Sequence, residues 1–330
     1  MLVRDTNIVI YFWRTTSSME FYLGVTDYNW YRFLVNQKRE DINFWKPGGK
    51  RAFRALSIGA PFLFKLKSPI NAIGGIGFFS SFSFLPLSIA WDAFGIGNGC
   101  DSFQQLQKMI SQYRKDHTLD NPIIGCIILT NPIFFSKDDW IPVPQDWRKH
   151  EMEGQTYSTT TETGLQLWNK VQSLLEKYLH SVSDEEKTQL ILEESEPLYG
   201  NSVLRKVRLG QGAFRILVTD AYNRRCTISG EKTLPVLESA HIKPYAKSGP
   251  HFISNALLLR SDLHKLFDAG YITITPDLKV EVSNRIKEEF ENGKEYYRFH
   301  GNNIYNLPIR LMDKPESKFV EWHNENIYNG

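Results

Sequence analysis

The chain has 330 residues, of which 42% are apolar and 23% charged, a composition that excludes wholesale disorder. This length exceeds what one compact core usually holds, so we expect two domains. The formal net charge of +2 says little about partners by itself. The three cysteines, Cys100, Cys126 and Cys226, lie too far apart for a disulfide framework or a four-cysteine zinc site, and we expect a cytoplasmic protein.

A β-rich segment punctuated by turns spans residues 20 to about 150. Apolar runs predict strands at residues 21–25, 61–67, 75–79 and 123–129. Helical spacing predicts helices at residues 27–36, 102–114 and 163–180. Ser102 is expected to be the N-cap of the second of these helices. The strands favour a barrel or a sandwich.

The segment 68–91 carries no charge over 24 residues, which raises the question of a membrane span. It also contains Pro69, Pro86, three glycines and five serines, which weaken a helix that faces lipid. The alternation of Phe and Ser at 77–84 is typical of buried strands. We therefore expect no contact with a membrane.

An acidic stretch is followed by a basic one. Residues 181–196 contain six acids and one lysine, and residues 201–275 contain eleven Lys or Arg against five acids. We expect one domain at 1–180, an acidic linker at 181–200 and a second domain at 201–330. The basic block favours contact with a polyanion, although an unevenly charged, solvated surface gives the same pattern.

The second domain has a short strand, loop, strand and helix as its expected frame. In chain order we expect a helix at 212–222, a turn at 226–231 between two short strands, a strand at 236–242, a loop at 244–255, a strand at 256–259, a helix at 261–269 and a hairpin of 271–275 with 278–282. Ser261 can cap the second helix, and Gly270 can end it.

Four residues in this frame carry the chemistry. His264 and Asp268 lie four residues apart on the predicted helix, so both metal-ligating groups project from one face. His241 lies on the preceding strand, and the amide of Asn255 can hold an imidazole ring in one tautomer. Hydrolysis of a phosphodiester needs a base that activates water and a cation that stabilises charge. A histidine is a competent base near neutral pH.

Each of these residues also has a purely structural interpretation. A strand histidine is usually a surface or hydrogen-bonded core residue, and His264 with Asp268 could be a pair on a helix surface. Asn255 could be a turn residue, and His251 stays unassigned. The ordered occurrence of all four within one frame, in basic surroundings, favours the chemical interpretation.

The segments ESAHIKP at 238–244 and GPHFISNALLLRSDLHKLFDAG at 249–270 resemble the HNH endonucleases. The resemblance covers roughly 205–285 and implies a ββα-metal fold, a β-hairpin packed on a helix around one divalent ion, Mg²⁺ or Mn²⁺. It implies His241 as the general base, Asn255 as the residue that orients it and His264 as a catalytic metal ligand. Asp268 is expected to be a second ligand from its position on the helix.

Two features depart from this family's pattern. Many relatives have Asp or His as a further ligand directly before the base, where this chain has Ala240. Glu238, two residues earlier, could compensate. Many relatives also have paired CxxC motifs, whereas Cys226 is followed three positions later by Ser229, so we expect no structural zinc.

Aromatic motifs in residues 20–160 resemble the EVE-type members of the PUA-like barrels, which precede HNH modules in some modification-dependent, type IV restriction endonucleases. That resemblance implies a pocket for a flipped base. The candidate walls are Tyr28, Trp30, Trp45 and Trp91, with Asp27 or Asp92 accepting from the amine of a cytosine. Aromatic residues of a barrel are more often core than pocket, so this alternative stays open.

Together these expectations describe an α+β protein with an N-terminal EVE/PUA-like β-barrel and a C-terminal HNH domain. Its expected function is a modification-dependent restriction endonuclease that reads 5-methyl- or 5-hydroxymethylcytosine in double-stranded DNA. The alternatives are an HNH nuclease for an unmodified sequence and a DNA-binding protein whose nuclease fold has lost its metal. A homodimer would suit two half-sites, but no sequence feature decides this.

Overall fold

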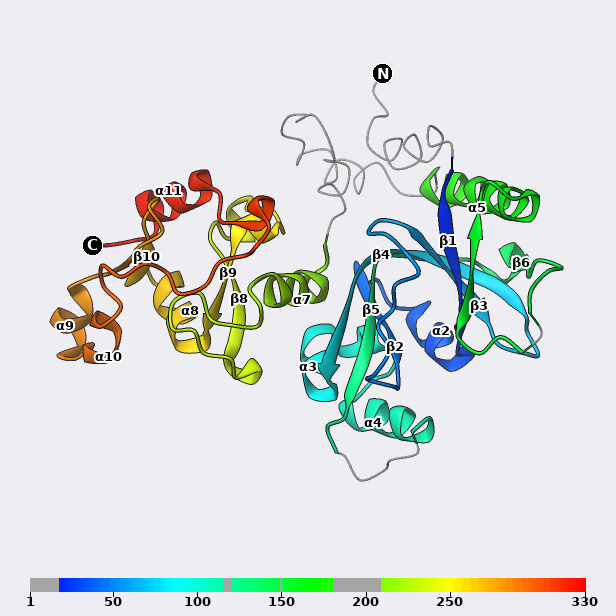
Figure 1. Cartoon of the computed structure of the whole chain (residues 1–330), viewed down its shortest axis with the longest axis horizontal. Coiled ribbons are helices and arrows are strands. Elements are labelled where there is room, and N and C mark those ends of the chain that lie inside the picture. The colour runs from blue at the N-terminus through cyan, green and yellow to red at the C-terminus, as the bar shows by residue number, and fades with distance from the viewer. Residues whose placement is uncertain (1–17, 115–119, 149, 181–208) are drawn as a thin grey trace, which may run out of the picture. The chain divides into compact units, whose positions relative to one another are not determined.

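The structure is a computed structural model that describes residues 18–114, 120–148, 150–180 and 209–330 (Figure 1). It divides into two compact units, Met1–Arg208 and Leu209–Gly330. The expected acidic linker at 181–200 lies outside the described residues.

A sheet of seven strands forms the frame of the first unit. Its strands are β1 (Glu20–Thr26), β2 (Asp41–Lys46), β3 (Pro61–Leu66), β4 (Ala72–Pro86), β5 (Ile123–Phe134), β6 (Ile141–Pro142) and β7 (Gly154–Ser158). They pair in the order β2-β5-β4-β3-β1-β7, and β6 pairs with β4. β1 and β3 are parallel, whereas the other pairs are antiparallel.

Within the described residues this sheet is open, with β2 and β7 at the two ends of the pairing path. The expectation of an α+β fold is confirmed, but the closed barrel is corrected to an open sheet. The physical reason is that apolar alternation specifies which face of a strand is buried. It does not specify whether the last strand of the path pairs with the first.

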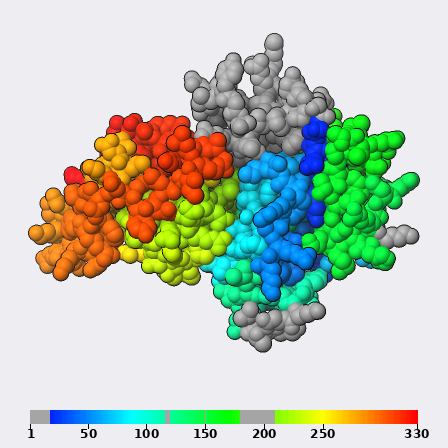
Figure 2. All heavy atoms as spheres, viewed as in Figure 1, coloured from blue at the N-terminus to red at the C-terminus, as the bar shows by residue number. Residues whose placement is uncertain are grey.

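Both faces of the sheet are covered, and the alternation along β1 shows how. Phe21 and Leu23 pack with Trp168 of the helix α5 (Glu162–His180). Tyr22, between them, packs on the opposite face with Trp30 of α2 (Tyr28–Leu34). In the space-filling view, residues 150–180 (green) form the outer side of the first unit next to β1 (dark blue; Figure 2).

Two further helices lie between β4 and β5, and the first of them contains the end of the uncharged segment 68–91. They are α3 (Leu87–Phe94) and α4 (Phe103–Gln112), joined through the 3₁₀ turn η1 (Gly95–Asn98), and a second 3₁₀ turn is η2 (Lys137–Asp139). Ser102 caps α4 as predicted, its hydroxyl accepting from the backbone N–H of Gln105 at 3.3 Å. α3 was not predicted from the sequence, because its first five residues belong to the charge-free run 68–91, in which the alternation of Phe and Ser favoured strands.

The second unit is built from short elements. They are α7 (Gln211–Ala221), η4 (Leu234–Val236), β8 (Leu237–His241), η5 (Tyr245–Lys247), η6 (Ile253–Asn255), β9 (Ala256–Arg260), α8 (Ser261–Asp268), β10 (Ile272–Ile274), β11 (Val280–Val282), α9 (Arg285–Phe290), α10 (Lys294–Tyr297), η7 (Leu311–Asp313) and α11 (Ser317–Asn326). β8 and β9 form one antiparallel pair, and β10 and β11 form another.

Two local predictions for this unit were wrong. The turn at 226–231 has no flanking strands, because the backbone around Cys226 bonds to Glu231 and to β9 in separate places. α8 begins at Ser261 itself, with Arg260 as an N-cap whose side chain makes no capping hydrogen bond. The end of the helix is as expected, because Gly270 adopts a positive φ of 75° directly after it.

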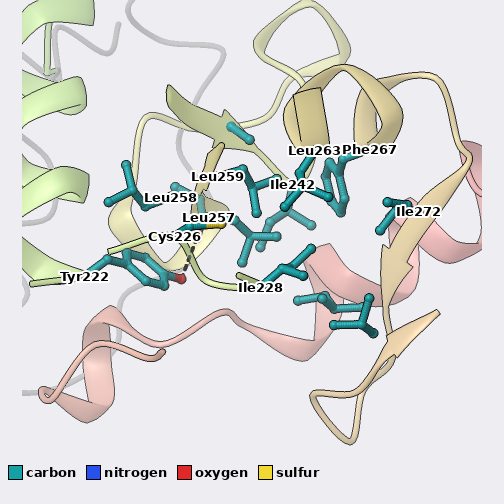
Figure 3. Packing of buried hydrophobic residues seen from close by; sticks show 14 of the residues in the cluster. Tyr222, Cys226, Ile228, Ile242, Leu257, Leu258, Leu259, Leu263, Phe267 and Ile272 are labelled. Atoms are coloured by element: carbon teal, nitrogen blue, oxygen red, sulfur yellow. Dashed lines mark hydrogen bonds between the residues drawn. The ribbon is translucent and has the colours of Figure 1, made fainter. Parts of the chain in front are cut away.

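The core of the second unit holds the β8–β9 hairpin against α7 and α8. Leu257, Leu258 and Leu259 of β9 are fully buried and meet Leu263 of α8 (Figure 3). The hydroxyl of Tyr222 donates to the carbonyl of Ala256 at 2.8 Å, which ties the end of α7 to the start of β9. The hairpin and the helix after it are therefore fixed relative to one another.

No helix in the described part of the chain is long and apolar enough to cross a membrane. The thiols of Cys100, Cys126 and Cys226 are buried, and none of the three forms a disulfide bond.

Candidate active site and base-binding cavity

The second unit contains a cavity of about 510 Å³ that brings together the residues singled out from its sequence. α7 supplies one wall with Phe214 and Arg215, and β8 supplies another with Glu238 and His241. α8 adds His264 and Asp268, and α11 adds His323. Asn255 lies outside this lining.

His241, the predicted base, stands at the end of β8. Its ring stacks on Phe214 with centroids 4.2 Å apart and an angle of 12°, and His251 meets it edge-on at 4.9 Å. Burial, followed by the charges of His251 and His264, lowers its pKa to about 4. Nε2 is enclosed and has no hydrogen-bond partner among the described residues, which leaves Nδ1 as the nitrogen that can meet a water.

His264, the predicted ligand, lies between two carboxylates. Its Nδ1 is 2.7 Å from Oε2 of Glu238 on β8, and its Nε2 is 3.2 Å from Oδ2 of Asp268, one turn further along α8. Glu238 had been considered only as a substitute for the ligand missing at Ala240. The structure places it in direct contact with the ring, because the strand brings Glu238 against α8 while Ala240 is buried.

Asn255 is fully buried and fixes the loop that follows His241. Its Oδ1 accepts from the backbone N–H of Lys243 at 2.9 Å, and its Nδ2 donates to the carbonyls of Lys243 and Pro250 at 3.0 and 2.9 Å. The sequence analysis expected the amide to hold an imidazole ring directly. The amide bonds instead to the main chain at Lys243 and Pro250.

Residues 226–275 match the family described as HNH endonuclease. This stretch contains the β8–β9 hairpin and α8, with His241, Asn255, His264 and Asp268 upon them. The second unit contains an HNH endonuclease domain. The protein is therefore a DNA endonuclease, a hydrolase of phosphodiester bonds. No curated protein matches the chain in sequence.

Three solved structures are similar to parts of this chain. ASCH from Zymomonas mobilis is 13% identical with a TM-score of 0.30, and the match covers 46% of this chain and 94% of that one. A mutant of the same protein is 10% identical, with a TM-score of 0.30 and coverages of 44% and 95%. The modification-dependent TagI restriction endonuclease is 14% identical with a TM-score of 0.26, and covers 89% of this chain and 78% of its own.

HNH domains generally use one divalent metal ion. Among the residues that the structure describes, no group of three or more His, Cys, Asp and Glu is arranged to hold one. The reason is that Glu238 and Asp268 contact opposite nitrogens of His264, so the ring separates the two carboxylates. One nitrogen with one carboxylate still fits a divalent ion, while the other carboxylate orients the ring, as is usual for metal-binding histidines.

Phe214 was missed by the sequence analysis, although it shapes the environment of the base. It lies on the buried face of α7, before the stretch that matches the HNH family. The position of an aromatic residue on the apolar face of an amphipathic helix predicts a core residue, and only the fold shows that His241 stacks on it.

The first unit contains a larger cavity of about 940 Å³. Its aromatic lining consists of Tyr22, Trp30, Phe44, Trp45, Phe53, Tyr113 and Trp147. Its charged lining includes Asp27, Lys46, Lys65, Lys67, Glu151 and Glu153. This combination of ring faces and a few polar groups is typical of sites that bind small aromatic ligands.

Three of the predicted pocket residues line this cavity, namely Asp27, Trp30 and Trp45. Tyr28 is 40% exposed and stacks on Tyr31, and Trp91 and Asp92 lie on α3. The structure does not place these three in the cavity lining. The residues that the sequence analysis missed come from segments whose proximity only the fold establishes, such as Tyr113 after α4 and Trp147 between β6 and β7.

The predicted wall residues have structural roles as well. Trp30 is 3% exposed and meets Phe44 and Phe64 edge-on, so it also fills the core. Oδ1 of Asp27 accepts from the backbone N–H of Asn29 at 2.9 Å and caps α2, while Oδ2 is 3.5 Å from Nζ of Lys67. Nε1 of Trp45 donates to the carbonyl of Asn98 at 3.0 Å, which fixes the position of the ring.

Proposed function

We propose that this DNA endonuclease is a metal-dependent restriction enzyme that cleaves double-stranded DNA containing a modified cytosine. The cutting half of the proposal rests on one observation: a histidine held neutral by burial and an imidazole between two carboxylates share a single cavity. The reading half is supported by the aromatic cavity of the first unit.

His241 is the general base. Its neutral ring accepts a proton from a water at Nδ1, and the resulting hydroxide attacks phosphorus while the bond to the leaving oxygen breaks. Stacking on Phe214 fixes the plane of the ring. Asn255 fixes the loop that follows His241 and thereby where the ring stands. No step requires His241 to change position.

His264 and Asp268 hold the divalent ion, with Glu238 on the other nitrogen of the ring. A bound divalent ion supplies stabilisation of the negative charge that develops on the phosphate and on the leaving oxygen. The contact from Glu238 keeps Nδ1 protonated and leaves the lone pair on Nε2. Asp268, at 3.2 Å from Nε2, is then the carboxylate on the ligand side.

The first unit selects the DNA. An extruded base costs a few kcal/mol, which stacking on aromatic faces and polar contacts to the base edge can offset. Tyr113 and Trp45 lie with their ring centroids 6.2 Å apart on one side of the cavity. The hydroxyl of Tyr113 donates to Oδ2 of Asp27 at 3.4 Å and accepts from Nζ of Lys67 at 3.3 Å, so both charged groups lie beside this ring.

The test incubates the protein with matched duplexes that are unmodified, 5-methylated or 5-hydroxymethylated, with and without Mg²⁺ or Mn²⁺. We expect cleavage of modified duplexes only when metal is present. His241→Ala should abolish it, while a control change at the exposed His300, to Ala, should not. Calorimetric titration with Mn²⁺ should show weakened binding in His264→Ala and, less severely, in Asp268→Ala.

Other results would favour the alternatives. Equal cleavage of all duplexes would point to a nuclease for an unmodified sequence. Specific DNA binding without cleavage under any metal would point to a binding protein with an inactive nuclease fold, as the alanine at position 240 allows.

A further inference from the structure

Lys65 is a buried cation in the wall of the large cavity of the first unit. It lies on β3, whose other residues are apolar, and it is 5% exposed. Burial lowers the pKa of its ammonium group. The pairing of β3 with β4 is irregular between Leu63 and Lys65, and such irregularities redirect side chains.

The partners of this ammonium group are all neutral. Nζ donates to Oδ1 of Asn71 at 2.9 Å and lies 5.1 Å from the centroid of the Trp147 ring. Among the described residues no carboxylate forms an ion pair with it. An ammonium group has three donors, so the amide and the ring face leave part of its hydrogen-bonding capacity for a further acceptor.

The two other lysines of the cavity differ from Lys65 in this respect. Lys46 pairs with Glu153 at 2.8 Å, and Lys67 lies 3.5 Å from Asp27. Their charges are already balanced by carboxylates of the protein. A buried cation without such a carboxylate is costly, and a ligand that brings a strong oxygen acceptor lowers that cost.

The cavity has space for more than a bare base. Its volume of about 940 Å³ falls at the upper end of the range for drug-sized ligands. Val25 and Trp147 line it beside Lys65, whereas Trp45 and Tyr113 line it beside Lys67. A base stacked beside Trp45 and Tyr113 leaves room for its substituent to extend toward Lys65 and Trp147.

We propose that Lys65, held by Asn71 beside Trp147, is a specificity-determining residue that donates a hydrogen bond to an oxygen of the base substituent, so that the cavity prefers cytosine with an oxygenated 5-substituent to 5-methylcytosine. The inference rests on the proposed reading function and narrows its substrate class. A methyl group offers no acceptor to the ammonium group and would leave it as unsatisfied as in the free protein.

The experiment measures binding of the full-length protein to fluorescently labelled duplexes without divalent metal, so that no cleavage occurs. The duplexes carry cytosine, 5-methylcytosine, 5-hydroxymethylcytosine or glucosylated 5-hydroxymethylcytosine at one position. We expect the wild type to bind at least one oxygenated duplex about tenfold more tightly than the methylated one, the size of one hydrogen bond from a charged donor.

Two variants and a control locate the effect. Lys65→Met keeps the length of the side chain and should bring that ratio close to one, with affinity for 5-methylcytosine retained. Asn71→Asp supplies the missing carboxylate, so it should lower the ratio while raising the melting temperature. Asn71 has a positive φ of 48°, which aspartate also tolerates. Lys108→Met, at an exposed position on α4, should change nothing.

The outcomes distinguish a failure of this inference from a failure of the proposed reading function. A wild type that binds methylated and oxygenated duplexes equally, but both better than the unmodified one, overturns the role of Lys65 and leaves the reading function standing. The same holds if a folded Lys65→Met and a folded Asn71→Asp both keep the wild-type ratio. A wild type that binds all four duplexes equally overturns the reading function itself.

Discussion

The proposed role of His241 as the general base depends on what surrounds its ring. Its ring lies flat on Phe214, and burial is the largest cause that lowers its pKa from 6.5 to about 4. Only the neutral ring can accept a proton, so protonation removes the base as the pH falls through about 4. At neutral pH nearly all molecules therefore have the base in its active form.

A first prediction concerns the pH dependence of cleavage. Phe214→Leu removes the flat cover of His241 and admits water, so its pKa should rise toward 6.5 and the acid limb of the rate should move up with it. Single-turnover cleavage rates between pH 5 and 8 measure this. In the wild type, titration of His241 should not change the cleavage rate in that range. An unchanged pH profile in a folded Phe214→Leu would contradict burial as the cause of the lowered pKa.

His323 gives a second prediction, for stability. The residue is 2% exposed, with Nδ1 2.9 Å from the hydroxyl of Thr273 and Nε2 3.1 Å from the carbonyl of Phe267. Burial lowers its pKa from 6.5 to about 4. The unfolded chain thus binds a proton at a higher pH than the folded one, and the unfolding free energy should decrease by up to about 3 kcal/mol as the pH falls from 6.5 to 4.

Chemical denaturation at several pH values measures this decrease. In His323→Gln, which cannot take up the proton, the decrease should be smaller by that amount, even if the substitution lowers stability at neutral pH. A matched change at the exposed His150, to Gln, should retain the wild-type pH dependence. If His323→Gln loses as much stability on acidification as the wild type does, other groups are responsible.

At the scale of elements, the loop between β8 and β9 holds the base in place, and Gly249 makes its shape attainable. A Cβ at this position would lie 1.8 Å from the carbonyl oxygen of Lys243, whereas one at Gly48 would meet nothing within 4 Å. The carbonyl of Lys243 is also an acceptor for Asn255. The tight packing of the loop and the hydrogen bonds of Asn255 therefore depend on each other.

A third prediction follows for Gly249→Ala. The added methyl group should displace the loop, cost about 1–3 kcal/mol in unfolding free energy and reduce cleavage at least tenfold. Mn²⁺ binding should be largely retained, because His264 and Asp268 lie on α8. Gly48→Ala is the control and should leave both measurements unchanged. Full cleavage by Gly249→Ala would show that the loop does not position His241.

The HNH hairpin and helix could be predicted from the sequence because all their signals are local. His241, Asn255, His264 and Asp268 lie within 28 consecutive residues, and the apolar runs between them specify two strands and a helix in order. The contact between Glu238 and His264 could not be predicted, since it depends on how the strand packs against the helix. The same limit applies to Asn255, whose amide has several acceptors within reach in a loop.

At the scale of the whole molecule, the full lining of the large cavity could not be predicted from the sequence. Its walls come from β1, β2, β3, the end of α4 and the segment between β6 and β7, which the sheet order alone brings together. The resemblance to EVE-type barrels implied a pocket for a base, and of the four rings expected as its walls only Trp30 and Trp45 line this cavity. The sequence does single out Lys65, because a lysine within the apolar run PFLFKL is unusual: lysine is almost never fully buried unless it is paired.

A last prediction uses two tryptophans of the first unit that the sequence analysis treated alike. Trp45 lines the cavity, whereas Trp91 lies on α3 with its ring 6.5 Å from that of Phe103. Trp45→Ala should lower the preference for modified over unmodified duplexes by about 1–3 kcal/mol, the contribution of one stacked ring, and Trp91→Ala should not. Neither change should affect Mn²⁺ binding, since the metal residues belong to the second unit. Cutting by Trp45→Ala at high protein concentration should then become indifferent to modification, and equal losses of preference in both variants would contradict the assignment of this cavity to the base.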